Sequence, residues 1–407
     1  MTATATQRTP LVVAILLLVI PLSQLPIDIY TPAIPQMMEE LGGSSTLLQN
    51  SVSAYVLGMA LGLVPVGVLA DALGRRPVLL SCLALLSVTS VGIALCGDPW
   101  LLLVLRFVQG LGGCACMVVV YAIAADVARG SELTSLSGWL GAAWGLAPVL
   151  APAAGGIIVQ FVSWRVIFAV IAVLAAGAVL MVWRLLPETL PAERRVPVQL
   201  GPIGRALGAA LRRPLFLGLT IVFALFASAQ LLFGVVGPFL YEVRLGFEPG
   251  VYGLIALLVG AANLTGELSI GVLAKRLRPA TIGFGAFGFF AAGTAVLLVT
   301  GLTVGIDPVW LTVGGMLVMI GCGALCPLAY GQALGLFDRN LGLMGGLTSA
   351  VCYLLVAGTM ALGAVLPDDT VLPLASIYVG CGVLGLLLLI LCLRPMTSTV
   401  ARAVASH

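Results

Sequence analysis

Two charged residues inside long apolar segments are the side chains of this sequence best suited to chemistry. Asp28 lies in the first such segment and Arg106 in the fourth. A guanidinium inside a membrane is costly unless a partner neutralises it. Both residues are expected in the outer half of the bilayer, so Asp28 is the predicted partner. Because burial favours a protonated aspartic acid and a nearby arginine favours the ionised form, movement of Arg106 would load and unload a proton at Asp28.

Each of these residues also has a structural interpretation. Arg106 could extend toward the membrane surface and bond backbone carbonyls. Asp28 could cap the outer end of its helix, where Pro26, Pro32 and Pro35 favour local unwinding. The sequence leaves these alternatives open.

Two residue counts exclude other chemistry. The sole histidine, His407, ends the chain, so no histidine proton relay or histidine-ligated metal site is expected within the membrane. The sole lysine, Lys275, follows Ala274 and therefore forms no Gly-Lys-Ser/Thr phosphate loop. We therefore expect no cofactor, no metal and no enzymatic activity, with an ion gradient as the energy source and a carboxylate as the proton carrier.

The elements that must position these groups are membrane helices. The chain has 407 residues, of which 61% are hydrophobic and 9% charged, whereas soluble domains carry about a quarter charged residues. This composition excludes a soluble enzyme and a nucleic-acid-binding protein, and it predicts an all-α integral membrane protein. The sequence contains twelve apolar runs of about 20 residues, each long enough to cross a bilayer. They cover residues 11–33, 49–70, 77–96, 100–125, 134–161, 164–186, 215–241, 250–274, 280–301, 309–335, 342–366 and 371–393.

The distribution of positive charge orients these helices. Of the 19 Lys and Arg residues, only Arg165 and Arg244 fall in expected outer connections, and Arg106 lies within a span. Positive residues concentrate on the cytoplasmic side, so both termini are predicted in the cytoplasm. The polar stretch 187–214 is then a cytoplasmic linker. The predicted parts are a six-helix bundle at 1–186, this linker, a second six-helix bundle at 215–394 and a cytoplasmic tail at 395–407.

An internal repeat indicates that the two bundles are related. The sequence Gly-Val-Leu-Ala occurs at 67–70 after the second span and at 271–274 after the eighth. Equivalent positions in two parallel halves predict pseudo-two-fold symmetry, an architecture of alternating-access transporters.

The connection after the second span carries the most specific motif. Residues 67–77 read Gly-Val-Leu-Ala-Asp-Ala-Leu-Gly-Arg-Arg-Pro, in which glycine permits a tight turn and opposite charges can hold helix ends together. This segment resembles the loop motif of the major facilitator superfamily. The resemblance implies a conformational latch that includes the aspartate at the end of the fourth span, and the second copy departs from it with Lys275 at the aspartate position. The implied latch residues are Gly67, Asp71, Gly74, Arg75, Arg76 and Asp126.

Three further segments resemble parts of this family. Arg106, Gln109 and Gly110 match an R-x-x-Q-G element, and residues 26–35 are similar to the first helix of the Bcr/CflA branch of drug:proton antiporters. The fifth span partly matches the family's antiporter motif, with Ala151 in place of a glycine, and this implies export. The residues assigned to this antiporter helix are Gly145, Pro148, Pro152, Gly155 and Gly156.

Polar and aromatic residues inside spans are the candidates for contact with cargo. They are Tyr30, Tyr55, Gln109, Tyr121, Gln230, Phe233, Asn263 and Tyr330. Glu267 in the eighth span could line a pore or an inner vestibule, and the sequence does not decide between them.

Together these features predict a proton-coupled exporter of small organic molecules such as antibiotics, resident in a bacterial inner membrane. The resemblance implies a monomer whose partners are its cargo, protons and lipid, without nucleic acid. Three alternatives remain. They are export of one endogenous metabolite such as a siderophore or nucleoside, proton-coupled import, and a membrane-embedded enzyme or receptor.

Overall fold

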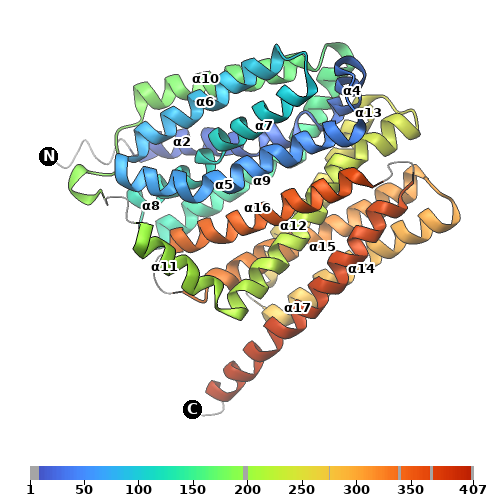
Figure 1. Ribbon diagram of the computed structural model, residues 1–407. Helices are drawn as coiled ribbons and strands as arrows, with labels where there is room; N and C mark the ends of the chain where they lie inside the picture. The colour runs from blue at the N-terminus through green and yellow to red at the C-terminus, as the bar shows by residue number, and fades with distance from the viewer. Residues whose placement is uncertain (1–8, 196–199, 275, 338–340, 367–369, 405–407) are drawn as a thin grey trace. The chain divides into compact units, whose positions relative to one another are not determined.

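The computed structural model describes residues 9–195, 200–274, 276–337, 341–366 and 370–404. Within these ranges every regular element is helical, and twelve helical segments are long and apolar enough to cross a membrane (Figure 1). The predicted all-α, twelve-span fold is therefore confirmed. Lys275 and His407 lie outside the described residues, as do Arg8 and Arg339, two of the arginines counted above on the cytoplasmic side.

Contacts divide the chain into two compact units, Met1–Pro202 and Ile203–His407, with the boundary inside the predicted linker. The first unit contains α2 (Thr9–Val19), η1 (Ile20–Ser23), α3 (Leu25–Asp28), η2 (Thr31–Ala33), α4 (Ile34–Leu41), α5 (Ser45–Leu73), α6 (Arg75–Ala94), α7 (Pro99–Gly113), α8 (Ala115–Val127), α9 (Gly130–Phe161), α10 (Arg165–Leu185) and η3 (Ala192–Arg194). The helix α11 (Leu200–Leu211) crosses the boundary. The second unit continues with α12 (Pro214–Pro238), the π-helix η4 (Phe239–Arg244), α13 (Pro249–Leu273), α14 (Pro279–Thr303), α15 (Pro308–Leu334), α16 (Leu341–Val365) and α17 (Leu372–Val404).

Two features differ from the sequence expectation. The loop motif is largely helical, because α5 continues through Leu73 and only Gly74 separates it from α6. The predicted tail at 395–407 begins inside α17, which continues to Val404. In both places the helix extends past the apolar run that marked the span, since a helix end does not have to coincide with the edge of the hydrocarbon.

The fourth and tenth spans begin in the same way. Asp98 precedes Pro99 at the start of α7, and its side chain accepts a hydrogen bond from the backbone N–H of Leu101 at 2.7 Å. Asp307 caps α15 in the same manner, again before a proline. An aspartate cap and a proline in the first turn are favourable starts of a helix. The two units thus share local start signals as well as the Gly-Val-Leu-Ala repeat.

Close helix packing in the first unit depends on small residues. A Cβ atom on Gly58 of α5 would lie 2.1 Å from the carbonyl oxygen of Phe107 in α7. Reciprocally, a Cβ atom on Gly110 of α7 would lie 2.1 Å from the carbonyl oxygen of Tyr55 in α5. Because apolar burial does not distinguish protein from lipid, such close contacts are a main source of helix association in membranes. The α5–α7 pair is therefore a tightly fitted body.

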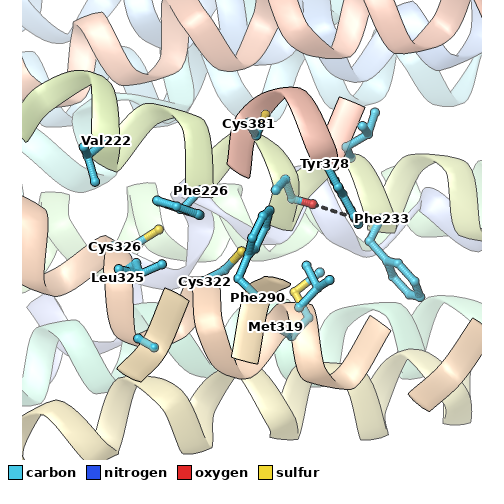
Figure 2. Packing of buried hydrophobic residues seen from close by; sticks show 14 of the residues in the cluster. Val222, Phe226, Phe233, Phe290, Met319, Cys322, Leu325, Cys326, Tyr378 and Cys381 are labelled. Atoms are coloured by element: carbon cyan, nitrogen blue, oxygen red, sulfur yellow. Dashed lines mark hydrogen bonds between the residues drawn. The ribbon is translucent and has the colours of Figure 1, made fainter. Parts of the chain in front are cut away.

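The second unit packs around α15, which contacts α12, α13, α14 and α16. Figure 2 shows the buried aromatic residues Phe226, Phe290 and Tyr378 with Cys322 and Cys326 of α15 beside them. The Phe226 and Phe290 rings meet edge to face at 5.0 Å, and the Tyr378 hydroxyl donates to the carbonyl oxygen of Ala229 at 2.9 Å. The two cysteines are free thiols that fill this core.

Candidate functional site

The first membrane span is a chain of short helices, and its breaks surround Asp28. It passes through α2, η1, α3, η2 and α4, and each element after α2 has a proline in its first turn. These prolines are Pro21, Pro26, Pro32 and Pro35. Proline has no backbone N–H and clashes with the preceding turn, so the helical ladder is repeatedly interrupted. The unwinding expected from the sequence is present.

Asp28 ends α3 and is buried, with 8% of its surface exposed. Its Oδ2 accepts a hydrogen bond from Nε2 of Gln24 at 2.9 Å, and its backbone carbonyl accepts one from Thr31 Oγ1 at 2.9 Å. Among the described residues, Asp28 is the only acidic residue that is buried. Its carboxyl group is thus held by a neutral amide inside the unit.

Arg106 of α7 is completely buried and bound by polar and aromatic groups. Its Nη1 donates to Oε1 of Gln109 at 2.6 Å and its Nε donates to the carbonyl oxygen of Ser51 at 3.4 Å. The guanidinium carbon lies 4.3 Å from the ring centre of Tyr30 and 4.5 Å from that of Tyr55, which are cation–π contacts. Its Nη2 has no hydrogen-bond partner among the described residues. The site therefore keeps a buried positive charge with one donor unused.

The predicted direct contact between Asp28 and Arg106 is absent, since none of the ion pairs in the described part of the chain joins them. The reason is the local backbone. The Asp28 carboxyl group bonds one helical turn back to Gln24, while the Tyr30 ring lies over the guanidinium. The expectation of an ion pair was wrong for this conformation, although the sequence placed both residues in the same unit.

A network of serine side chains completes the surroundings of Arg106. The hydroxyls of Tyr30 and Ser51 are 2.8 Å apart, and Gln109 Nε2 donates to Ser90 Oγ at 2.7 Å. The Tyr55 hydroxyl donates to the carbonyl oxygen of Ser23 at 2.9 Å. Tyr30, Tyr55 and Gln109, predicted to contact cargo, are fully buried here and instead hold Arg106. The sequence analysis missed the serines, whose only signal was a polar residue inside an apolar run.

The predicted antiporter helix packs directly on the segment that carries Asp28. A Cβ atom on Gly155 of α9 would lie 1.7 Å from the carbonyl oxygen of Ile29. The helix α9 continues through Pro148 and Pro152. Gly145, Pro152 and Gly156 are buried with Gly155, and Pro148 is partly buried. The small residues of this helix therefore let its backbone reach that of the broken first span.

The other predicted cargo residues are scattered. Tyr121 of α8 and Gln230 of α12 are partly buried, and Phe233 is buried in the second unit's core against Gly315. Tyr330 of α15 packs its ring on Phe223 at 5.4 Å. Phe233 is therefore a packing residue in this conformation.

Asn263 of α13 belongs to a polar pair in the second unit. Its Nδ2 donates to Oε1 of Glu267 at 2.9 Å. This places Glu267, the acid whose role the sequence left open, beside a predicted cargo residue.

The loop motif forms a charged cluster at the junction of α5 and α6. The Arg75 guanidinium bonds Oδ1 of Asp71 through Nη1 and Oδ2 of Asp126 through Nε, the latter at 3.2 Å. Gly74 has φ of 111°, which L side chains rarely adopt, and it allows the immediate turn between the helices. Gly67 lies on α5 near α8, where a Cβ atom would be 3.3 Å from Val118. The structure thus brings together three of the four charged latch residues, Asp71, Arg75 and Asp126.

Glu188, just after α10, is a part of this cluster that sequence analysis missed. Its carboxylate accepts backbone N–H bonds from Arg75 at 3.0 Å and Arg76 at 3.2 Å, and so satisfies the start of α6. Next to it, Thr189 Oγ1 donates to Asp126 Oδ2 at 3.0 Å. Arg76 itself extends to the carbonyl oxygen of Trp183. The start of the linker is therefore bound into the motif.

A second charged cluster joins α4 to α10. The Arg165 guanidinium pairs with Glu40, and the indole N–H of Trp164 donates to the same carboxylate at 2.9 Å. The backbone N–H of Trp164 donates to Oε1 of Gln36 at 3.1 Å. This cluster fixes the end of the broken first span to the sixth span.

Fold and site together define a membrane transporter, and the chain belongs to the Major Facilitator Superfamily, whose family model matches residues 16–339. Among its relatives, the chain is 32% identical to "Uncharacterized MFS-type transporter YdgK" of Bacillus subtilis (strain 168), over 61% of this chain and 63% of that protein. It is 28% identical to "Multidrug resistance protein MdtL" of Escherichia coli O157:H7, over 91% of this chain and 93% of that protein.

Solved structures show the same fold. A human organic anion transporter, MFSD10, matches with a TM-score of 0.69 and 20% identity, over 94% of this chain and 99% of that one. A D-xylose–proton symporter matches with a TM-score of 0.73 and 16% identity, over 95% of this chain and 98% of that one. At these identities the likeness concerns the fold. The family match and the twelve candidate spans of the described residues make the chain a multi-pass membrane transporter.

Proposed function

We propose that this transporter exports small organic molecules, antibiotics among them, across a bacterial inner membrane in exchange for protons. The similarity to MdtL over nearly the whole chain supports multidrug export. The positive-inside distribution of arginine supports cytoplasmic termini. Asp28 is the proposed proton carrier, Arg106 its electrostatic counterpart, and the Arg75 cluster the latch of one conformation.

The observation that carries the proposal is the bond between Asp28 and Gln24. The amide nitrogen of Gln24 donates to Asp28 Oδ2, whereas its Oε1 is buried without a partner among the described residues. An ionised carboxylate needs a donor, and a protonated carboxyl needs an acceptor. Gln24 carries both, so rotation of its amide serves either protonation state. A carboxyl group with such a partner can exchange a proton without leaving a buried charge unpaired.

The arrangement around Arg106 supplies the other half of the cycle. Its unused Nη2 can bond an anionic group. When Asp28 is ionised, movement of Tyr30 away from the guanidinium would let the two opposite charges approach. Protonation of Asp28 removes that attraction, and Tyr30 returns to the guanidinium of Arg106, which stays beside Tyr55 throughout. Binding of cargo from the cytoplasm then favours release of the proton from Asp28. Cargo binding and proton binding therefore alternate.

The test is proton release from acidified inverted membrane vesicles, followed with an internal pH dye while a panel of antibiotics is added. For the wild type we expect at least one compound to cause proton release and its own accumulation. Asp28→Asn should abolish both at equal protein level. Glu39→Gln is the matched control, because Glu39 is an exposed acid at the end of the same span, and it should leave both unchanged. Proton-coupled accumulation that persists in Asp28→Asn would refute Asp28 as the carrier.

A further inference from the structure

A second amide–carboxyl pair lies in the other unit, on α13. Asn263 Nδ2 donates to Glu267 Oε1 at 2.9 Å, four residues along the helix, as Gln24 does to Asp28 in the first span. Asn263 is 4% exposed, and its Oδ1 is buried without a hydrogen-bond partner among the described residues. The described residues supply Glu267 with no arginine or lysine ion pair. Within the described residues, the carboxyl group of Glu267 therefore has an amide donor and no cationic partner.

The helix packing makes this pair a fixed feature of the unit. A Cβ atom on Gly323 of α15 would lie 2.1 Å from the backbone oxygen of Asn263 and 3.1 Å from its Oδ1. One on Gly266 would lie 2.3 Å from the carbonyl oxygen of Ile320. The close approach of the two helices fixes Asn263, and Asn263 in turn orients one oxygen of Glu267.

The two carboxyl groups differ in how accessible they are. Asp28 is buried, so a proton can reach it through water more readily than an organic group can. Glu267 is only partly buried, and the bond from Asn263 engages one of its two oxygens. A carboxylate in a span is stabilised by a cation that donates hydrogen bonds to it. A protonated amine supplies the positive charge and the hydrogen-bond donors that this position lacks among the described residues.

We propose that Glu267, oriented by Asn263, binds the ammonium group of amine-containing cargo. This inference rests on the proposed export function, to which it adds a substrate class. Glu267 makes the direct contact, and Asn263 is a positioning residue.

The test measures binding of doxorubicin, which carries a primary ammonium group near neutral pH, and of N-acetyldoxorubicin, in which that charge is removed. The full-length purified protein is titrated in lipid nanodiscs. The wild type should bind doxorubicin at least tenfold more tightly than the acetylated compound, the difference expected for one charge-assisted hydrogen bond. Glu267→Gln should lower the doxorubicin affinity about tenfold and leave that of the acetylated compound unchanged. Glu267→Asp, which keeps the charge, should retain part of the preference.

Glu242→Gln is the matched control. Glu242 lies on η4 of the same unit, and its Oε1 is likewise buried without a partner among the described residues. This variant should keep the preference for doxorubicin. Equal binding of the two compounds by the wild type, an unchanged preference in Glu267→Gln, or a loss in Glu242→Gln would each overturn the inference.

If Glu267→Gln does not fold, protection of Glu267 in the wild type from a carbodiimide decides the question. Doxorubicin should protect this residue, and equal modification with and without it would refute the contact. Failure here is separable from failure of the proposed function. Proton release caused only by uncharged compounds would reject the ammonium site and leave antiport intact. Selective doxorubicin binding without any coupled proton release would support the ammonium site and reject the proposed antiport.

Discussion

Replacing Gly155 with alanine places a methyl group against the backbone of the broken first span. The added Cβ atom would lie 1.7 Å from the carbonyl oxygen of Ile29, and the next nearest atom, the carbonyl carbon, is 2.8 Å away. Both are backbone atoms, so no side chain can rotate to make room. The contact must open to at least 3.0 Å, which requires α9 and the segment after Asp28 to separate.

The expected cost follows from packing. Overpacking of this kind costs about 1–3 kcal/mol, and the better helix propensity of alanine returns about 0.5–1 kcal/mol. The net cost is then about 0–2.5 kcal/mol, and at about 2–4 °C per kcal/mol for a unit of this size the melting temperature should fall by up to about 10 °C. Proton-coupled export should fall as well, because the displaced carbonyl adjoins the proposed proton carrier.

Gly138 provides the matched control for this prediction. It lies in the same helix, and a Cβ atom there would meet nothing within 4 Å. Gly138→Ala should therefore melt at the wild-type temperature or slightly above it and retain export. Scanning fluorimetry of the purified variants and vesicle transport measure the two effects. If Gly155→Ala matches Gly138→Ala in both melting temperature and transport, the close contact contributes neither to stability nor to export.

Three further substitutions test the polar clusters. Glu188→Ala removes the acceptor of two backbone N–H groups at the start of α6 and should cost about 1–2 kcal/mol; an unchanged melting temperature would contradict the capping role. Gln109→Leu leaves Nη1 of buried Arg106 without its closest acceptor and should lower the free energy of unfolding by about 1–3 kcal/mol. An unchanged melting temperature would mean that another group binds the guanidinium. Trp164→Phe keeps an aromatic side chain but loses the bond to Glu40 and part of the buried indole. The lost bond should cost about 0.5–1.5 kcal/mol, any further loss in the same assay is the cost of the smaller ring, and an unchanged melting temperature would contradict the role of the bond.

Much of the fold could be predicted because lipid imposes a simple rule on the sequence. Apolar runs must be about as long as the membrane is thick, so the twelve spans were visible as runs. Helix ends were less visible: α5 extends to Leu73, past the apolar run that ended at residue 70. The turn at Gly74 could be predicted because few residues other than glycine tolerate its positive φ.

The details of the site were less predictable, for two physical reasons. Residue counting gives the depth of Asp28 and Arg106 but not the direction of each side chain, and the prolines of the first span change that direction within a few residues. Glu188 was hidden because its role depends on the linker returning to α6, a contact between residues far apart in sequence. Composition marked the linker as polar and could not show where its carboxylate would bind.

The close contacts of the first unit restrict which part of it can respond to a proton. Reciprocal glycine contacts at Gly58 and Gly110 leave α5 and α7 little room to slide, so Arg106 stays fixed relative to Ser51 and Tyr55. Packed interfaces of this kind move as rigid bodies rather than deforming gradually. The first span, in contrast, is a series of short helices, and Gly155 joins it to α9. We therefore expect the contact between Tyr30 and Arg106 to be where the two bodies separate, with the first span and α9 moving together against α5 and α7.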